Sequence, residues 1–186
     1  DWIREDLSRA LAGLVSGPSG SGAAGLPEAL AAGAHALAAT DLPVAIDPAA
    51  AALLFHVDED GRRALRPGGD GYRYDGEPGS RTAAELAAEI IQEPAAWSAG
   101  TLLRPLVQDA VLPTAAVIGG WGELAYQAQL GPARDLAGLP PVPFLPRVSI
   151  TLTDAECRAS LAKTELAAAG ILAGEALTVK EGGAEG

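Results

Sequence analysis

The sequence predicts an α/β protein in which helices surround a short, mostly parallel sheet. Several segments repeat apolar residues every three to four positions, as one face of a helix requires. A β-rich run, residues 114–118, is followed by glycines and then by a helical segment, which is the strand, turn and helix unit of parallel sheets. Turn signals between short strand-like runs predict a β-meander inserted at residues 52–76.

Length and composition describe a unit of one domain's size with an aliphatic core. The chain has 186 residues, of which 48% are hydrophobic but only 4% aromatic, so we expect a core of Ala, Leu and Val. The sequence begins at Asp1 and contains no methionine, and we expect it to be a piece of a longer protein.

Charge and cysteine content exclude several classes of function. The formal net charge of −11 disfavours binding to nucleic acid or to an anionic membrane surface. A single cysteine, Cys157, excludes an internal disulfide, and with only two separated histidines it also excludes a zinc site of ordinary spacing, so no metal is expected. We expect a reducing, cytoplasmic location, without a transmembrane span or signal peptide.

Two helices are predicted at the start of the chain. Residues 2–14 place apolar side chains at steps of four, four and three, which is typical of an amphipathic helix. Pro27 suits the first turn of a second helix that runs to about residue 39 and, being nearly all Ala and Leu, is expected to be buried. The run 42–46 suits a strand that Asp47 and the following proline would end.

The next segment predicts the meander. Residues 53–57 and 62–66 are strand-like, and Asp60 with Gly61 between them is typical of a type I′ turn. A further glycine-rich turn leads to a third short strand ending near residue 76. We expect this meander to decorate one edge of the sheet.

Capping residues predict two further helices. Ser80 and Thr82 compete as the N-cap of a helix over residues 83–92. Thr153, with Glu156 three residues later, predicts a capped helix over residues 154–168. Between them, the central unit predicts a helix over residues 123–130, a short helical piece ending near Gly138, and extended segments at 143–145 and 148–152.

Arg104 and Gln108 are the first candidate ligand-binding residues. Apolar residues form one stripe of the helix before the glycines, so these two share the opposite face, four positions apart. An arginine fork suits a carboxylate or phosphate, although a surface arginine paired with a nearby acid fits the same pattern. Asp109 lies off that face, and the sequence leaves open whether it binds a ligand or caps the next loop.

The glycine turn with Glu123 is the second candidate. Gly119, Gly120 and Gly122 allow a tight turn and close backbone approach, to which helix N–H groups point. Glu123 already satisfies the helix dipole, which favours a sugar hydroxyl or an amine over a nucleotide phosphate. The alternative is an ordinary acid at a helix start.

Three further residues extend this candidate site. Tyr126 lies three positions after Glu123 and therefore faces the same side of the helix, unless it is a core tyrosine. Arg147 and Ser149 alternate along an extended segment, so both are expected on one face, and a second arginine near Arg104 would suit a diacid.

His35, His56 and Cys157 are not candidates for chemistry. Neither histidine has a partner pattern, so both are expected to be structural or surface residues. Cys157 lies at a helix start among acidic residues, which does not favour a catalytic thiolate.

These motifs resemble one enzyme family. The segments LLRPLVQDAVLPTAAVIGGWGELAY and PFLPRVSITL resemble the cysteine-adding enzymes of bacillithiol biosynthesis, whose pattern includes LRPLxQDxLLPT, YVGGPGExxY and PRxS. Val117 and Trp121 depart from it, standing where the family has an aromatic residue and a proline. With the hairpin EDGRRALRPGGDGYRYDG, the likeness covers about residues 40–155. The matching positions are Arg104, Gln108, Asp109, Pro113, Thr114, Gly119, Gly120, Gly122, Glu123, Tyr126, Pro146, Arg147 and Ser149.

The resemblance implies a fold and an activity. Residues 1–155 would be the second half of a Rossmann-like core domain with the 52–76 insertion, residues 154–179 a helical segment leading toward a coiled coil, and residues 180–186 a disordered tail. The family adds cysteine to glucosaminyl malate in the last step of bacillithiol synthesis, and this chain would bind the sugar-malate part.

The remaining implications concern catalysis and assembly. The family's TGQQ-like and SEDHD-like segments and its coiled coil are not in this chain, so we expect no ligase activity from residues 1–186 alone. The catalytic residues stay unassigned, an adenine nucleotide is one cofactor that the family allows, and the full-length protein is expected to be a homodimer through the coiled coil. The alternative is a non-catalytic α/β module that binds a small metabolite, such as a sugar or diacid.

Overall fold

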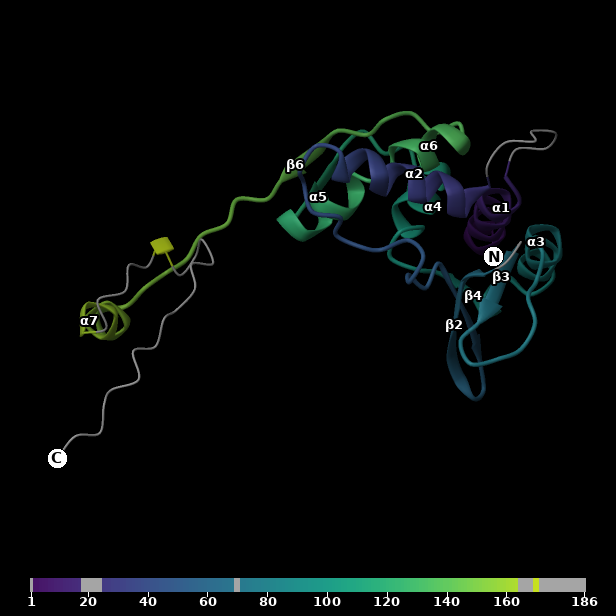
Figure 1. Cartoon of the computed structure of the whole chain (residues 1–186), viewed down its shortest axis with the longest axis horizontal. Coiled ribbons are helices and arrows are strands. Elements are labelled where there is room, and N and C mark those ends of the chain that lie inside the picture. Colours follow the sequence, from purple (N-terminus) through teal and green to yellow (C-terminus); the bar gives the residue numbers. More distant parts are fainter. Residues whose placement is uncertain (1, 18–24, 69–70, 164–168, 171–186) are drawn as a thin grey trace. The chain divides into compact units, whose positions relative to one another are not determined.

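A computed structural model describes residues 2–17, 25–68, 71–163 and 169–170, and the chain divides into two compact units, Asp1–Arg147 and Val148–Gly186. Figure 1 labels the elements. Those of the first unit are α1 (Trp2–Ser16), α2 (Leu26–Ala38), β1 (Leu54–Asp58), β2 (Gly61–Gly68), β3 (Gly71–Tyr74), α3 (Ala83–Gln92), the 3-10 helix η1 (Pro94–Ala96), β4 (Trp97–Ala99), α4 (Arg104–Val111), β5 (Val117–Gly119), α5 (Trp121–Gln127), α6 (Gly131–Leu136) and β6 (Phe144–Pro146).

The larger sheet is antiparallel, which corrects the expectation of a mostly parallel sheet. Its strand order is β3-β2-β1-β4, and β1 pairs with both β2 and β4 in antiparallel register. The predicted meander is therefore confirmed as strands, but it forms most of this sheet and does not decorate another one. The physical reason is that Leu54 on β1 pairs with Leu65 and, on its other side, with Ala99 of the distant β4, a contact that local patterns do not encode.

The hairpin turn differs from the prediction by one residue. Asp58 pairs with Gly61, so the loop consists of Glu59 and Asp60. A type I′ turn needs positive φ at both loop residues. Only Gly61, with φ of 126°, adopts such a value here, and Asp60 does not. The type I′ prediction is wrong because the glycine pairs in β2 and does not occupy the loop.

Parallel pairing is confined to β5 and β6. Val117 pairs with Phe144 and Gly119 with Pro146, and the connection between the strands runs through α5 and α6. This is the predicted strand, turn and helix unit, although β5 begins three residues later than expected.

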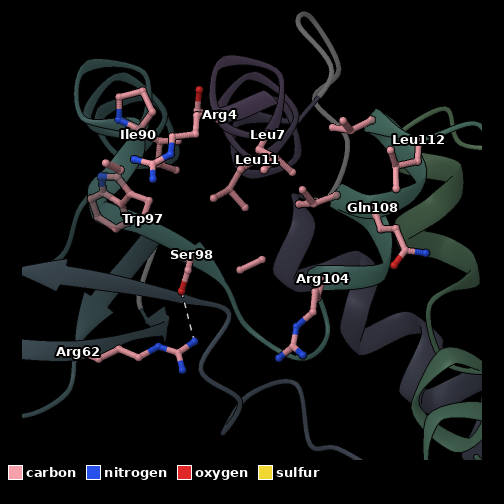
Figure 2. Close-up of a pocket in the computed structure, with 16 residues that line it drawn as sticks. Arg4, Leu7, Leu11, Arg62, Ile90, Trp97, Ser98, Arg104, Gln108 and Leu112 are labelled. Atoms are coloured by element: carbon pink, nitrogen blue, oxygen red, sulfur yellow. Dashed lines mark hydrogen bonds between the residues drawn. The ribbon is translucent and has the colours of Figure 1, made fainter. Parts of the chain in front are cut away.

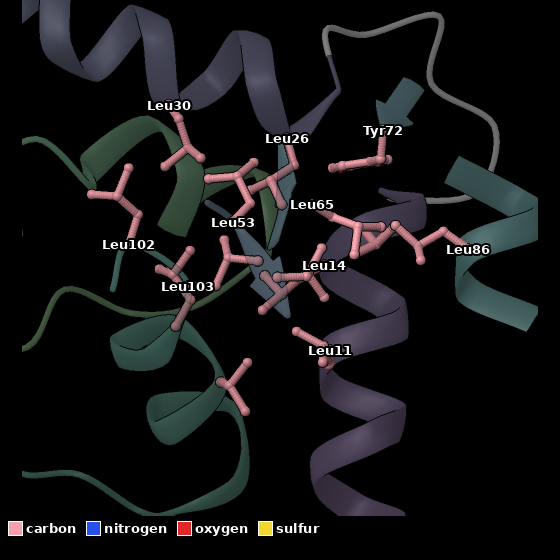
Figure 3. Packing of buried hydrophobic residues seen from close by; sticks show 14 of the residues in the cluster. Leu11, Leu14, Leu26, Leu30, Leu53, Leu65, Tyr72, Leu86, Leu102 and Leu103 are labelled. Carbon is pink, nitrogen blue, oxygen red and sulfur yellow. The ribbon is translucent and has the colours of Figure 1, made fainter. Parts of the chain in front are cut away.

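The core is aliphatic, as composition predicts. Side chains from α1, α2, the larger sheet and the start of α4 point toward one another in Figure 3. The helices α1 and α3 pack side by side (Figure 1), and α2 packs on α6. The helix α2 buries only one face. On that face, Gly33 lies against the backbone of Gln129, and an added Cβ would stand 1.9 Å from the Gln129 carbonyl oxygen.

The predicted strand at residues 42–46 is absent. This segment is irregular, and Leu42 is 55% exposed. The buried side chain of Gln129 takes the place of a neighbouring strand, because its amide donates to the Ile46 carbonyl at 2.9 Å and its oxygen accepts from the Ile46 N–H at 3.4 Å. The N–H and the carbonyl of Ile46 are therefore satisfied without a ladder.

Helix α3 begins as the sequence predicts. Thr82 is its N-cap, and Ser80 is not: the Thr82 hydroxyl accepts from the Glu85 N–H, while the Glu85 carboxylate accepts from the Thr82 N–H at 2.8 Å. This capping box satisfies two otherwise unpaired helix donors.

The second unit contains α7 (Ala155–Lys163) among its described residues. Its cap is Asp154, whose carboxylate accepts from the Cys157 N–H at 2.7 Å, so the predicted Thr153 and Glu156 capping box is wrong. Residues 148–152 are not a strand. The predicted continuation to residue 168 and the 180–186 tail lie outside the described residues. None of the described helices has the length and apolarity needed to cross a membrane.

Candidate functional site

The glycine turn between β5 and α5 is most crowded at Gly119. A Cβ there would lie 2.5 Å from Glu123 Oε2 and 2.6 Å from Phe144 Cζ, so a larger residue would displace the ends of these two side chains. Gly120 is the N-cap of α5, and its N–H donates to Glu123 Oε2 at 3.3 Å. Gly122 faces open space, so a side chain at this position would meet no steric obstacle.

Glu123 is half-buried and uses both carboxylate oxygens. One accepts from the Gly120 N–H, and the other accepts from the Tyr126 hydroxyl at 3.4 Å. Burial raises the pKa of Tyr126, the Glu123 carboxylate raises it further, and the Arg104 guanidinium acts in the opposite direction. The phenol therefore stays protonated and donates to Glu123, as their shared helix face predicts.

Arg147 lies over the turn. Its main-chain N–H donates to the Gly119 carbonyl at 2.8 Å, which fixes the end of β6 against β5. Its guanidinium nitrogen Nη2 is only 3.2 Å from the point where a Cβ on Gly120 would stand. Arg147 is exposed, and within the described part of the chain it has no ion-pair partner. A cation and the Glu123 carboxylate thus flank one turn.

Arg104 begins α4, and Gln108 follows one turn later on the same exposed face. Arg104 is close enough to Tyr126 for its charge to affect the phenol's pKa, and among the described residues it has no ion pair. Both residues also line a cavity of about 690 Å³ (Figure 2). That Arg104 and Arg147 bind one anion together stays a prediction.

Asp109 has a structural partner. Its Oδ2 pairs with Arg134 Nη1 at 2.5 Å, and the two side chains are only 2% and 9% exposed. The other guanidinium nitrogen of Arg134 donates to Gln127 Oε1 at 3.1 Å. Asp109 therefore joins α4 to α5 and α6 and does not cap the next loop.

Sequence reasoning does not find Arg134. The available signal is an arginine that follows the apolar Ala133 in a short helix, because a buried arginine needs an acid, and the acid next to it in the sequence is Asp135. Nothing in the local pattern says which acid, since Asp109 is 25 positions away.

Ser149 and Trp121 are the last residues that the sequence singles out. Ser149 is exposed in the second unit, and because β6 ends at Pro146, the predicted shared strand face with Arg147 is not formed. Trp121, which departs from the family pattern, is 65% exposed at the start of α5.

The two histidines and the cysteine have structural or surface surroundings. His56 stacks edge-on against Trp97 at 4.9 Å between ring centroids, and its Nδ1 lies 3.3 Å from Asp58. His35 and Cys157 are exposed. In the described ranges, no three His, Cys, Asp or Glu side chains gather as metal ligands would.

Parallel strands joined through a glycine turn and a helix define a Rossmann-like α/β domain. A family model described as "Bacillithiol biosynthesis BshC, N-terminal Rossmann-like domain" matches residues 23–148. The chain therefore belongs to the BshC family.

Curated relatives named "Putative cysteine ligase BshC" support this assignment. The protein of Koribacter versatilis is 37% identical over 118 residues, which are 63% of this chain and 22% of that protein. That of Salinibacter ruber is 35% identical over 117 residues, 62% and 21% of the two chains. That of Geobacillus thermodenitrificans is 34% identical over 133 residues, 70% and 24%. The chain thus spans about a fifth to a quarter of the length of these relatives.

Proposed function

We propose that this chain is the sugar-malate-binding part of a cysteine ligase that adds cysteine to glucosaminyl malate in the last step of bacillithiol biosynthesis. The family assignment supports the reaction class. The main support for the binding role is the position of the Arg147 guanidinium over Gly120, beside the half-buried Glu123 carboxylate.

The two charges suit the two ends of such an acceptor. A guanidinium binds a carboxylate through paired, charge-assisted hydrogen bonds, so Arg147, together with Arg104, suits the malate part. Glu123 accepts hydrogen bonds and therefore suits a sugar hydroxyl or an ammonium group. The Tyr126 phenol holds Glu123 in place, and Gln108 offers an amide on the Arg104 face.

Four further parts of the proposal concern the complete ligase. Cysteine would be its second substrate, and an adenine nucleotide would be a candidate for activating a carboxylate. Dimerisation would use the family's coiled coil, and the location would be cytoplasmic. We assign no catalytic residue in this chain, since none of the described side chains forms a nucleophile and base pair at the turn.

Binding without turnover tests the proposal. Residues 1–186, titrated calorimetrically with glucosaminyl malate, should bind it, and the same sample supplied with cysteine and ATP should form no bacillithiol, because catalysis needs the complete set of groups in place. A complete ligase carrying this domain should form the product. Turnover by residues 1–186 alone would contradict the first expectation, and a complete protein that binds but never turns over would favour a non-catalytic binding module.

Glu123→Gln separates ligand binding from helix capping. If Glu123 only stabilises the start of α5, binding should hardly change, since a charge in a first helical turn contributes about 0.3–1 kcal/mol at an exposed site. If it accepts a hydrogen bond from the substrate, we expect a loss of affinity above about fivefold for glucosaminyl malate and almost none for an analogue without the amine or the relevant hydroxyl.

Calorimetry with both ligands on the complete ligase measures this difference. Glu28→Gln is the matched control, because Glu28 is an exposed first-turn acid of α2. Equal small losses for both ligands would leave Glu123 with the capping role alone.

A further inference from the structure

The first unit contains a pocket that shares only Arg104 and Gln108 with the candidate site described above. It has a volume of about 690 Å³ and lies among α1, α3, β4, α4 and β2. Figure 2 shows Leu7, Leu11 and Ile90, together with Arg4, along one side and Arg62, Ser98 and Arg104 along the other. Ligand pockets of this size typically combine an apolar wall with a few convergent polar groups.

The polar side of the pocket is cationic in a strongly acidic chain. The net charge is −11, yet no aspartate or glutamate lines this cavity in the part of the chain that the structure describes. Arg62 and Arg104 reach it from different elements, β2 and α4. Across the described ranges, neither arginine pairs with a carboxylate. Their charge is therefore available to a bound anion.

Arg62 is already held in position. Its Nη2 donates to the Ser98 hydroxyl at 3.3 Å, and its guanidinium carbon lies 3.6 Å from the centre of the Phe55 ring. A cation held over an aromatic face loses less side-chain freedom when it binds an anion. The remaining guanidinium donors can form further hydrogen bonds, since the group carries five.

The opposite wall is suited to a hydrocarbon or aromatic group. Leu7 is 39% exposed one turn before the buried Leu11, and Trp97, Val107 and Val111 continue the apolar surface. Covering such side chains contributes about 25 cal/mol per Å² of apolar area.

We propose that this pocket binds an organic carboxylate with an apolar or aromatic body. The carboxylate lies between Arg62 and Arg104, and the body covers the wall formed by Leu7, Ile90 and Trp97. Two guanidinium groups favour a carboxylate over a neutral polar group, and the apolar wall disfavours a small hydrophilic diacid. The pocket shares Arg104 with the proposed glycine-turn site, but Arg62 and the apolar wall take no part in that site. Variants of Arg62 and Leu7 therefore test this inference separately from the proposed function.

Calorimetric titration of residues 1–186 with 4-phenylbutyrate tests the proposal, with neutral 4-phenylbutyramide as the matched probe. We expect a Kd of about 1 mM or tighter for the carboxylate, which is reasonable for a probe of this size, and at least about tenfold weaker binding of the amide. Arg62→Gln should lower the affinity for the carboxylate about tenfold and should hardly change the affinity for the amide. Leu7→Gln should weaken both probes.

Arg73→Gln is the charge-matched control, since Arg73 is exposed on β3 and lies outside the pocket lining. Equal affinities for the two probes, or an equal loss in the Arg62 and Arg73 variants, would overturn the proposal. No binding of 4-phenylbutyrate, or self-association of the chain that buries this face, would overturn it as well. If Arg62→Gln does not change the affinity for 4-phenylbutyrate while glucosaminyl malate still binds, this inference fails and the proposed function stands.

Discussion

Replacing Arg134 with methionine should destabilise the first unit by about 3–5 kcal/mol, because Asp109 would become a buried carboxylate without a cation. The two side chains are only 9% and 2% exposed, and their atoms approach to 2.5 Å. Asp109 Oδ1 is buried and has no hydrogen-bond partner in the described structure. The carboxylate therefore has little other stabilisation once the arginine is lost. Gln127 would lose its contact with Arg134 as well.

Urea unfolding of residues 1–186, followed by circular dichroism, measures this loss. The double variant Asp109→Leu with Arg134→Met should recover much of it, because removing both charges leaves no unpaired ion, and the double-mutant cycle then gives the coupling. Arg9→Met is the control: Arg9 pairs with Asp6 at 2.6 Å but is 64% exposed, so we expect a change within about 0.5 kcal/mol. A double variant as unstable as the single one would contradict the ion-pair argument.

The same ion pair has a consequence for the candidate site. Asp109 is on α4, which also carries Arg104 and Gln108, while Arg134 is on α6 and contacts Gln127 at the end of α5. The pair therefore fixes the helix that carries one predicted arginine relative to the helix that carries Glu123 and Tyr126. A ligand site made from separate elements needs such fixed supports.

Local patterns predict the helices of this fold well. The apolar repeat before Ser16 and the capping box at Thr82 each depend on residues within one or two turns, and α1 and α3 form where these signals place them. The crowding at Gly119 is only partly local, because an added Cβ would meet Glu123, four positions away, and also Phe144, which is distant in the sequence.

Predictions fail where distant residues decide the structure. The segment before Asp47 has the composition of a strand, but at Ile46 the backbone binds the side chain of Gln129, 83 positions away. The antiparallel order of the larger sheet depends on β4 pairing with β1, in which Leu54 pairs with Ala99, 45 positions along the chain, and the role of Asp109 depends on Arg134. Such contacts come from tertiary packing, which propensity and periodicity do not contain.

Replacing Arg147 with alanine in a complete ligase should raise the KM for glucosaminyl malate by about tenfold or more, because a charge-assisted hydrogen bond contributes roughly 1.5–3 kcal/mol. Arg104→Ala should have an effect of similar size if both guanidinium groups hold the malate part. The KM for cysteine should change little, since neither arginine is proposed to contact it. Arg147→Lys should recover only part of the affinity, because an ammonium group lacks the planar fork.

Steady-state kinetics with each substrate varied in turn measures these effects, and Arg73→Ala is the control for loss of a positive charge outside the site. An Arg147 variant with both KM and kcat unchanged would remove the glycine turn from the acceptor site, whatever the behaviour of Arg104. A fall in kcat without a rise in KM would instead assign the arginine to the transition state, because ground-state binding would then be intact. Arg147 is the sharper of the two tests, since its guanidinium lies directly over Gly120, whereas Arg104 also lines the neighbouring pocket.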